Sequence, residues 1–214
     1  MTAAWDIHAL NAAVLSGLRA HAEALDLEQA VYGIDSEAEL GLHPLLADAL
    51  QRGGWGVQRE CCYPSDRRKS KRTEGARCDL VLTHDAAPLA EPGTAGTLFA
   101  GAHVPPEAAF WLEVKTVAQF ESGNVFPRYA AELNQPVMRD LAKLRSDPRI
   151  VHGGLLLVLF TRDGATAEHD ISYWLRRVGK KQIPLADVAV GGFRLNDRTG
   201  NGWCGTALVQ TGQP

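Results

Sequence analysis

Two opposite charges inside an apolar segment constrain this chain more than any other feature of its sequence. Residues 109–117 have the composition of a β-strand, yet Glu113 and Lys115 stand two positions apart within them. Because strand side chains alternate between the faces of a sheet, both charges are expected on one face. An unpaired buried carboxylate is costly. The segment therefore predicts that Glu113 is either paired with Lys115 or bound to a cation.

A single acid marks a second apolar segment, earlier in the chain. Residues 78–83 have the pattern of a short strand, and Asp79 is its only charged side chain. If this strand pairs with residues 109–117, Asp79 and Glu113 converge, and their repulsion requires a shared proton or a bridging cation. Mg²⁺ takes hard oxygen ligands of this kind, together with water and phosphate. The alternative is that Asp79 caps a turn after Arg77.

A divalent ion held by these two carboxylates would give the segment a chemical role. Such an ion polarises a phosphodiester and lowers the pKa of a bound water. Lys115 would lie beside it, where an ammonium group can orient the attacking water or offset charge in the transition state. The sequence leaves open whether Lys115 also acts as a base.

Composition excludes several other classes of protein. The chain has 214 residues, 45% of them hydrophobic and 22% charged, which is typical of one globular domain with a buried core. Residues 155–160, the longest apolar run, are far too few to cross a bilayer, and the first ten residues lack a secretory signal pattern. We therefore expect a cytoplasmic protein without membrane contact. Its cysteines match no zinc pattern and are expected to be reduced: Cys61, Cys62, Cys78 and Cys204.

A cluster of basic residues contrasts with the net charge of −3. Because a phosphate backbone responds to local charge more than to the total, this cluster is expected to contact nucleic acid. A solvated loop is the alternative. The cluster consists of Arg67, Arg68, Lys69, Lys71 and Arg72.

Periodicity and turn signals predict the order of the secondary-structure elements. Helices are expected over residues 3–30, in one or two pieces, and over residues 36–52, 129–144 and 169–177. Strands are expected over residues 55–63, 78–83, 109–117, 154–160, 188–195 and 203–209, with the last two forming a hairpin. Pro136 conflicts with a continuous helix over residues 129–144, so the helix either begins there or is kinked.

We interpret the chain as a single domain that carries additional elements at both ends. Residues 1–35 form a helical N-terminal decoration, and residues 36–160 form the core, with an Ala-, Pro- and Gly-rich insertion at 84–108. Residues 161–214 complete the same domain with a helix and two strands. Ser36 and Glu39 have the spacing of a capping box at the start of the first core helix.

The residues singled out above resemble a known signature. Asp79 followed by Glu113-Val114-Lys115 is similar to the D…E-X-K motif of the PD-(D/E)XK superfamily of restriction-endonuclease-like nucleases. The resemblance implies an α/β fold with an α-β-β-β-α-β core, in which helices flank a central mixed sheet. It also implies that Asp79, Glu113 and the main-chain carbonyl of Val114 are metal ligands.

Many members of this superfamily also carry a glutamate on the first core helix, which joins the metal site directly or through water. Glu39 resembles that residue, and Glu37 is the alternative. Weaker candidates for substrate contact are His43, Gln119, Glu121, Arg128, Tyr129 and Lys143.

The resemblance implies a metal-dependent nuclease that hydrolyses phosphodiester bonds, with DNA favoured over RNA as its partner and substrate. Mg²⁺ is the expected cofactor, and Mn²⁺ is a substitute. One alternative is a catalytically inactive nucleic-acid-binding or adaptor domain on the same fold. Another is an unrelated α/β domain in which Glu113 and Lys115 form a structural ion pair. Formation of a homodimer is left open.

Overall fold

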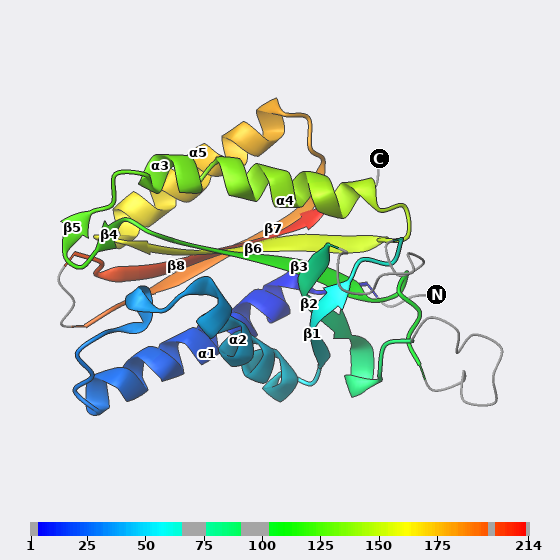
Figure 1. Cartoon of the computed structure of the whole chain (residues 1–214), viewed down its shortest axis with the longest axis horizontal. Helices are drawn as coiled ribbons and strands as arrows, with labels where there is room; N and C mark the ends of the chain where they lie inside the picture. Colours follow the sequence, from blue (N-terminus) through cyan, green and yellow to red (C-terminus); the bar gives the residue numbers. More distant parts are fainter. Residues whose placement is uncertain (1–3, 66–75, 91–102, 197–199, 213–214) are drawn as a thin grey trace.

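A mixed sheet of six strands forms the centre of the molecule, in the order β1-β2-β3-β6-β8-β7 (Figure 1). The structure is a computed structural model that describes residues 4–65, 76–90, 103–196 and 200–212. The strands of this sheet are β1 (Gly56–Cys62), β2 (Arg77–Thr83), β3 (Phe110–Ala118), β6 (His152–Thr161), β7 (Leu185–Arg194) and β8 (Trp203–Thr211). A separate hairpin pairs β4 (Phe120–Glu121) with β5 (Asn124–Val125).

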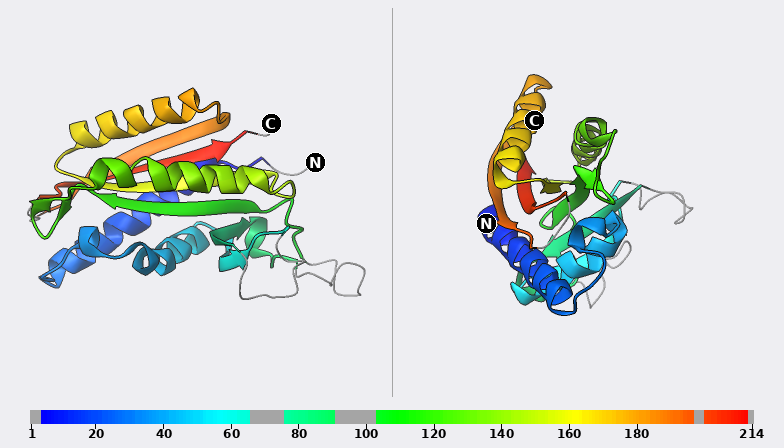
Figure 2. Two further views of the ribbon diagram at one scale, coloured as in Figure 1. Left: turned by 45° about the horizontal axis from the view of Figure 1, so that its top comes forward. Right: turned by 90° about the vertical axis from the view of Figure 1, so that its left-hand side faces the viewer.

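Helices cover both faces of the sheet, as the end-on view in Figure 2 shows. One face packs against α1 (Ile7–Leu27) and α2 (Glu39–Arg52), and the other against α4 (Gln135–Ser146) and α5 (Gly164–Lys180). A single turn, α3 (Tyr129–Glu132), precedes α4. Short 3-10 turns lie at Ile34–Ser36 and His84–Ala86. The expected α/β class, with a mixed sheet between helices, is confirmed.

The parallel pair β3–β6 lies at the centre of the sheet, and its burial explains the apolar sequences of both strands. The chain crosses from β3 to β6 through α4, as a parallel connection requires. The other neighbouring pairs of the six-stranded sheet are antiparallel. The C-terminal hairpin β7–β8 adds to the same sheet through β8, which pairs with β6.

Alternation along β3 divides its side chains between the two helical layers. Phe110, Leu112 and Val114 belong to the apolar cluster that includes α1 and α2. Glu113 and Lys115 face the other way, where each makes an ion pair with α4. The expectation that the two charges share one face is therefore confirmed.

Two expectations about helix ends have different outcomes. The capping box is wrong, because α2 begins at Glu39 with Ala38 as its N-cap, while Ser36 ends a 3-10 turn. The conflict at Pro136 is resolved by a new helix start, since α4 begins at Gln135 and the proline occupies its first turn. None of the helices within the described ranges has the length and apolar content needed to cross a membrane.

Candidate active site

The strands β2 and β3 separate at the residues that carry the predicted acids. Their paired register runs from Leu82 with Phe110 to Leu80 with Leu112. One step further, Asp79 would lie opposite Glu113. The backbone pairing of the two strands does not continue to this position. The Asp79 side chain contacts β3 there, and its Oδ2 accepts a hydrogen bond from the Val114 N–H at 2.7 Å.

Beyond Leu112, carboxylate side chains accept the hydrogen bonds of backbone N–H groups on the edge of β3 that faces β2. Asp79 accepts from the Val114 N–H, and Glu39 Oε2 accepts from the Thr116 N–H at 2.9 Å. In an extended strand, the N–H and C=O of one residue point toward the same edge. The Val114 carbonyl therefore faces the side on which Asp79 lies. These contacts also explain why Glu39 does not cap its own helix.

Glu113 is a buried acid, only 3% exposed. Its Oε1 accepts hydrogen bonds from the Lys143 ammonium at 2.7 Å and from the Tyr63 hydroxyl. Burial raises the pKa of Glu113 to about 7, and the negative charge of Asp79 adds to the effect. Burial also raises the pKa of Asp79, against the opposing hydrogen bond from Val114. Burial therefore makes it costly for both acids to be ionised at the same time.

Lys115 is held by acids from two different helices. Its Nζ donates to Glu39 Oε1 at 2.7 Å and lies 3.6 Å from Asp140 Oδ2. Burial acts to lower the pKa of Lys115, but the hydrogen bond and charge of Glu39 outweigh it, so the pKa is raised. Lys115 is therefore a protonated ammonium group at neutral pH. Among the residues that the structure describes, Glu113 pairs with Lys143, and Lys115 pairs with Glu39 and Asp140.

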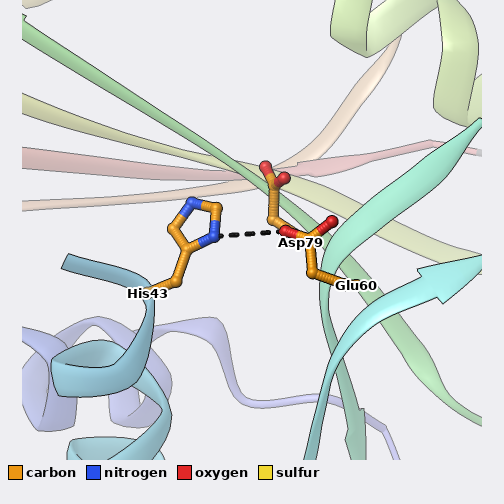
Figure 3. Close-up of side chains that lie close together, drawn as sticks. All are labelled: His43, Glu60 and Asp79. Atoms are coloured by element: carbon orange, nitrogen blue, oxygen red, sulfur yellow. Dashed lines mark ion pairs between the residues drawn. The ribbon is translucent and has the colours of Figure 1, made fainter. Parts of the chain in front are cut away.

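His43 brings an imidazole to the other side of Asp79. Figure 3 shows His43 of α2, Glu60 of β1 and Asp79 of β2 converging. One ligand atom from each lies within 4.8 Å of the others, and His43 Nδ1 is 3.6 Å from Glu60 Oε1. Burial lowers the pKa of His43, against the opposing charges of Glu39 and Glu60.

Glu60 has an unusual backbone conformation for a residue in a strand. Its φ is +54°, in the left-handed region, and the paired register of β1 with β2 passes from Arg59–Leu80 to Cys61–Cys78 on either side of it. The carbonyl of Glu60 accepts a hydrogen bond from Arg77 Nη1 at 2.9 Å. This interruption of the ladder lies at the level of Asp79.

A cleft of about 760 Å³ borders the site beside Glu39 and Thr116. It extends toward the β4–β5 hairpin, and three further acids line it: Asp35, Glu37 and Glu121. An acid-rich lining repels phosphate groups. This cleft is therefore a poor path for a nucleic-acid backbone.

The sequence-predicted residues Glu39, Asp79, Glu113, Val114 and Lys115 meet in one region through the contacts above. The alternative Glu37 bonds instead to His21 at 2.6 Å. Tyr129 donates to Asp170 at 2.6 Å, on the α5 side of the sheet. The predicted basic cluster Arg67, Arg68, Lys69, Lys71 and Arg72 lies outside the described residues.

Sequence reasoning missed Tyr63, Glu60 and Asp140. Asp140 and Lys143 are three residues apart on α4, a spacing that puts both on one helical face. That spacing is present in the sequence, but which strand the face contacts depends on tertiary packing.

Compared with protein-family models, curated proteins and solved structures, the chain matches none of them.

Proposed function

We propose that the chain is a metal-dependent nuclease of the PD-(D/E)XK type, which hydrolyses phosphodiester bonds in DNA. The observation that carries this proposal is the convergence of Asp79 and Glu113, with Lys115 alongside, where β2 and β3 separate. The order α2, β1, β2, β3, α4, β6 resembles the core of that superfamily and adds support.

The donors at this point fit a hard divalent cation. Two carboxylates and a main-chain carbonyl offer the oxygen ligands that Mg²⁺ prefers, and Mn²⁺ accepts the same set. The raised pKa values of Asp79 and Glu113 are a physical sign that this pair is better accommodated with added positive charge. Asp79, Glu113 and Val114 are the residues that would hold the ion.

Each neighbouring side chain then has a distinct role. The bound ion would supply Lewis-acid polarisation of the phosphodiester and acidify a water. The Lys115 ammonium would stabilise negative charge that develops on the phosphate. Tyr63 and Lys143 orient Glu113 through its Oε1. Both oxygens of Glu39 bond to Lys115 and the Thr116 N–H, so we assign Glu39 to positioning Lys115 in place of direct metal binding.

Nucleic acid is the proposed partner because of the basic cluster of residues 67–72, and the resemblance to DNA-cutting nucleases favours DNA. In the sequence this cluster lies between β1 and β2, and Arg77 begins β2 two positions before Asp79. Its cations would contact the phosphate backbone and make binding sensitive to salt. A cytoplasmic location is part of the same proposal, and formation of a homodimer is left open.

A cleavage assay tests the function. Purified protein is incubated with linear duplex, circular and single-stranded DNA and with RNA, in Mg²⁺, in Mn²⁺ and in EDTA. We expect metal-dependent cleavage of DNA, reduced roughly a hundredfold or more in Asp79→Asn and Glu113→Gln. The matched control is Glu168→Gln, at an exposed position of α5, which should cleave at the wild-type rate.

Two outcomes would overturn the nuclease assignment. One is a wild-type protein that leaves all four substrates intact in both metals. The other is cleavage that persists unchanged in Asp79→Asn and Glu113→Gln. Salt-sensitive DNA binding without cleavage would select an inactive nucleic-acid-binding domain on the same fold.

A further inference from the structure

We infer that His43, Glu60 and Asp79 form a second cation site, with one nitrogen and two oxygen ligands, that takes a transition ion such as Mn²⁺. The three side chains come from α2, β1 and β2 and converge in Figure 3. The site shares Asp79 with the proposed nuclease centre but uses neither Glu113 nor Val114. Cation binding here does not require nuclease activity.

The spacing of the donor atoms suits an ion better than a hydrogen bond. The separation of 3.6 Å between His43 Nδ1 and Glu60 Oε1 is too long for a hydrogen bond. Two donors that bind one ion at about 2.1 Å are separated by about 3.0 to 4.2 Å, depending on the angle between them. All three donor atoms lie within 4.8 Å of one another, so small side-chain movements would complete the geometry.

His43 is held in a way that makes it a fixed ligand. It lies one helical turn after Glu39, so α2 presents both side chains toward the same part of the sheet. Its side chain is almost completely buried, and Nε2 has no hydrogen-bond partner among the residues that the structure describes. The proposed ligand is the other ring nitrogen, Nδ1, and Nε2 would carry the ring proton when Nδ1 binds an ion. Its Nδ1 faces Glu60 and Asp79 (Figure 3).

Solvent reaches the three-residue cluster at Glu60. Its side chain is 46% exposed, whereas that of His43 is 4% exposed. A cation could therefore reach the cluster from the Glu60 side and keep water as its remaining ligands. The pinned carbonyl of Glu60, bound by Arg77, limits how far the side chain can move away.

The charge balance of the surroundings favours a cation. Among the described residues, the acids that meet here outnumber the basic side chains near them by five to four: Glu39, Glu60, Asp79, Glu113 and Asp140 against Arg77, Lys115, Arg139 and Lys143. The region is therefore net negative when its groups are ionised. The imidazole ligand selects among cations, because Mg²⁺ prefers oxygen donors whereas Mn²⁺ and Zn²⁺ also accept nitrogen.

Mn²⁺ binding followed by electron paramagnetic resonance tests this inference. Titration counts the bound ions, and spin-echo envelope modulation detects a ¹⁴N nucleus coordinated to Mn²⁺. We expect nitrogen modulation in the wild type and its loss in His43→Gln. In Glu60→Gln the affinity of this ion should fall about tenfold or more. The matched control is His169→Ala on the exposed side of α5, which should retain the nitrogen signal.

The Glu113→Gln variant separates this inference from the nuclease proposal. It removes a ligand of the proposed Mg²⁺ centre but leaves His43, Glu60 and Asp79 in place, so the nitrogen signal should persist even where cleavage is lost. Circular dichroism confirms that each variant is folded, and the exposed Glu60 substitution provides an independent test should His43→Gln unfold. The inference is overturned by wild-type Mn²⁺ without nitrogen modulation, by modulation that survives in folded His43→Gln, or by unchanged affinity in Glu60→Gln.

Discussion

The ionisation of Glu113 should make the unfolding free energy of the metal-free protein depend measurably on pH. Its pKa is about 7 in the folded chain, against an ordinary value of 4.5. Between these values the unfolded chain has released the proton while the folded chain still holds it. The stabilisation from the protonated form is thus fully present below pH 4.5 and is lost as pH rises through about 7. A difference of about 2.5 pKa units corresponds to about 3 kcal/mol for a group that is buried.

Glu113→Gln should remove this pH dependence, because glutamine has no proton to release. The hydrogen bonds from Tyr63 and Lys143 also change, but that contribution is largely independent of pH. Relative to the wild type, the variant should therefore gain about 3 kcal/mol of unfolding free energy between about pH 4.5 and about pH 8. Asp79 and Glu113 titrate together, so the measured pKa belongs to the pair.

Urea denaturation in EDTA at a series of pH values measures this effect, with an unchanged dependence on urea as the check that both proteins unfold alike. Glu168→Gln provides the control and should parallel the wild type at every pH. Saturating Mg²⁺ should flatten the wild-type profile, because the ion displaces the proton. A constant difference between wild type and Glu113→Gln across this range would refute the reasoning.

Three further substitutions test individual contacts. Glu39→Gln removes the negative partner of Lys115, so the cleavage rate should fall about tenfold or more. The Mg²⁺ affinity, measured by calorimetry, should change little. A large loss of affinity would instead make Glu39 a direct ligand. Lys143→Met removes the ammonium beside Glu113, so the midpoint of the pH–stability profile should move above about 7; an unmoved midpoint would contradict that contact. Tyr63→Phe removes a hydrogen-bond donor from the same buried carboxylate and should cost about 1–3 kcal/mol of unfolding free energy at neutral pH, whereas Tyr173→Phe, on the surface of α5, should cost much less.

Local periodicity predicted the parts of the site that depend on local geometry. Glu113 and Lys115 share a face because side chains alternate along any strand, and this holds whatever the strand packs against. Asp79 meets Glu113 because β2 and β3 are paired up to Leu80 and Leu112, and these two acids are the next residues beyond the last pair. Pro136 lies in the first turn of α4, one of the two outcomes that its fixed φ allows.

The partners of these charges depend on packing between distant segments, which periodicity does not contain. Glu39 had the spacing of a capping box and also resembled a metal-site glutamate, and in the structure its two oxygens bond to Lys115 and to the Thr116 N–H. Lys143 reaches Glu113 because α4 packs over β3, and Tyr63 reaches it from the segment that follows β1. The tertiary structure therefore determines which partner each charged side chain contacts.

The central claim is that Asp79 and Glu113 hold one divalent cation between them. A crystal structure of the Mn²⁺-soaked protein, with anomalous scattering to locate the metal, tests it most directly. We predict an anomalous peak within about 2.2 Å of a carboxylate oxygen from each of the two residues. Saturating Mn²⁺ with no peak between them, or with the two carboxyl groups hydrogen-bonded to one another through a shared proton, would contradict the claim.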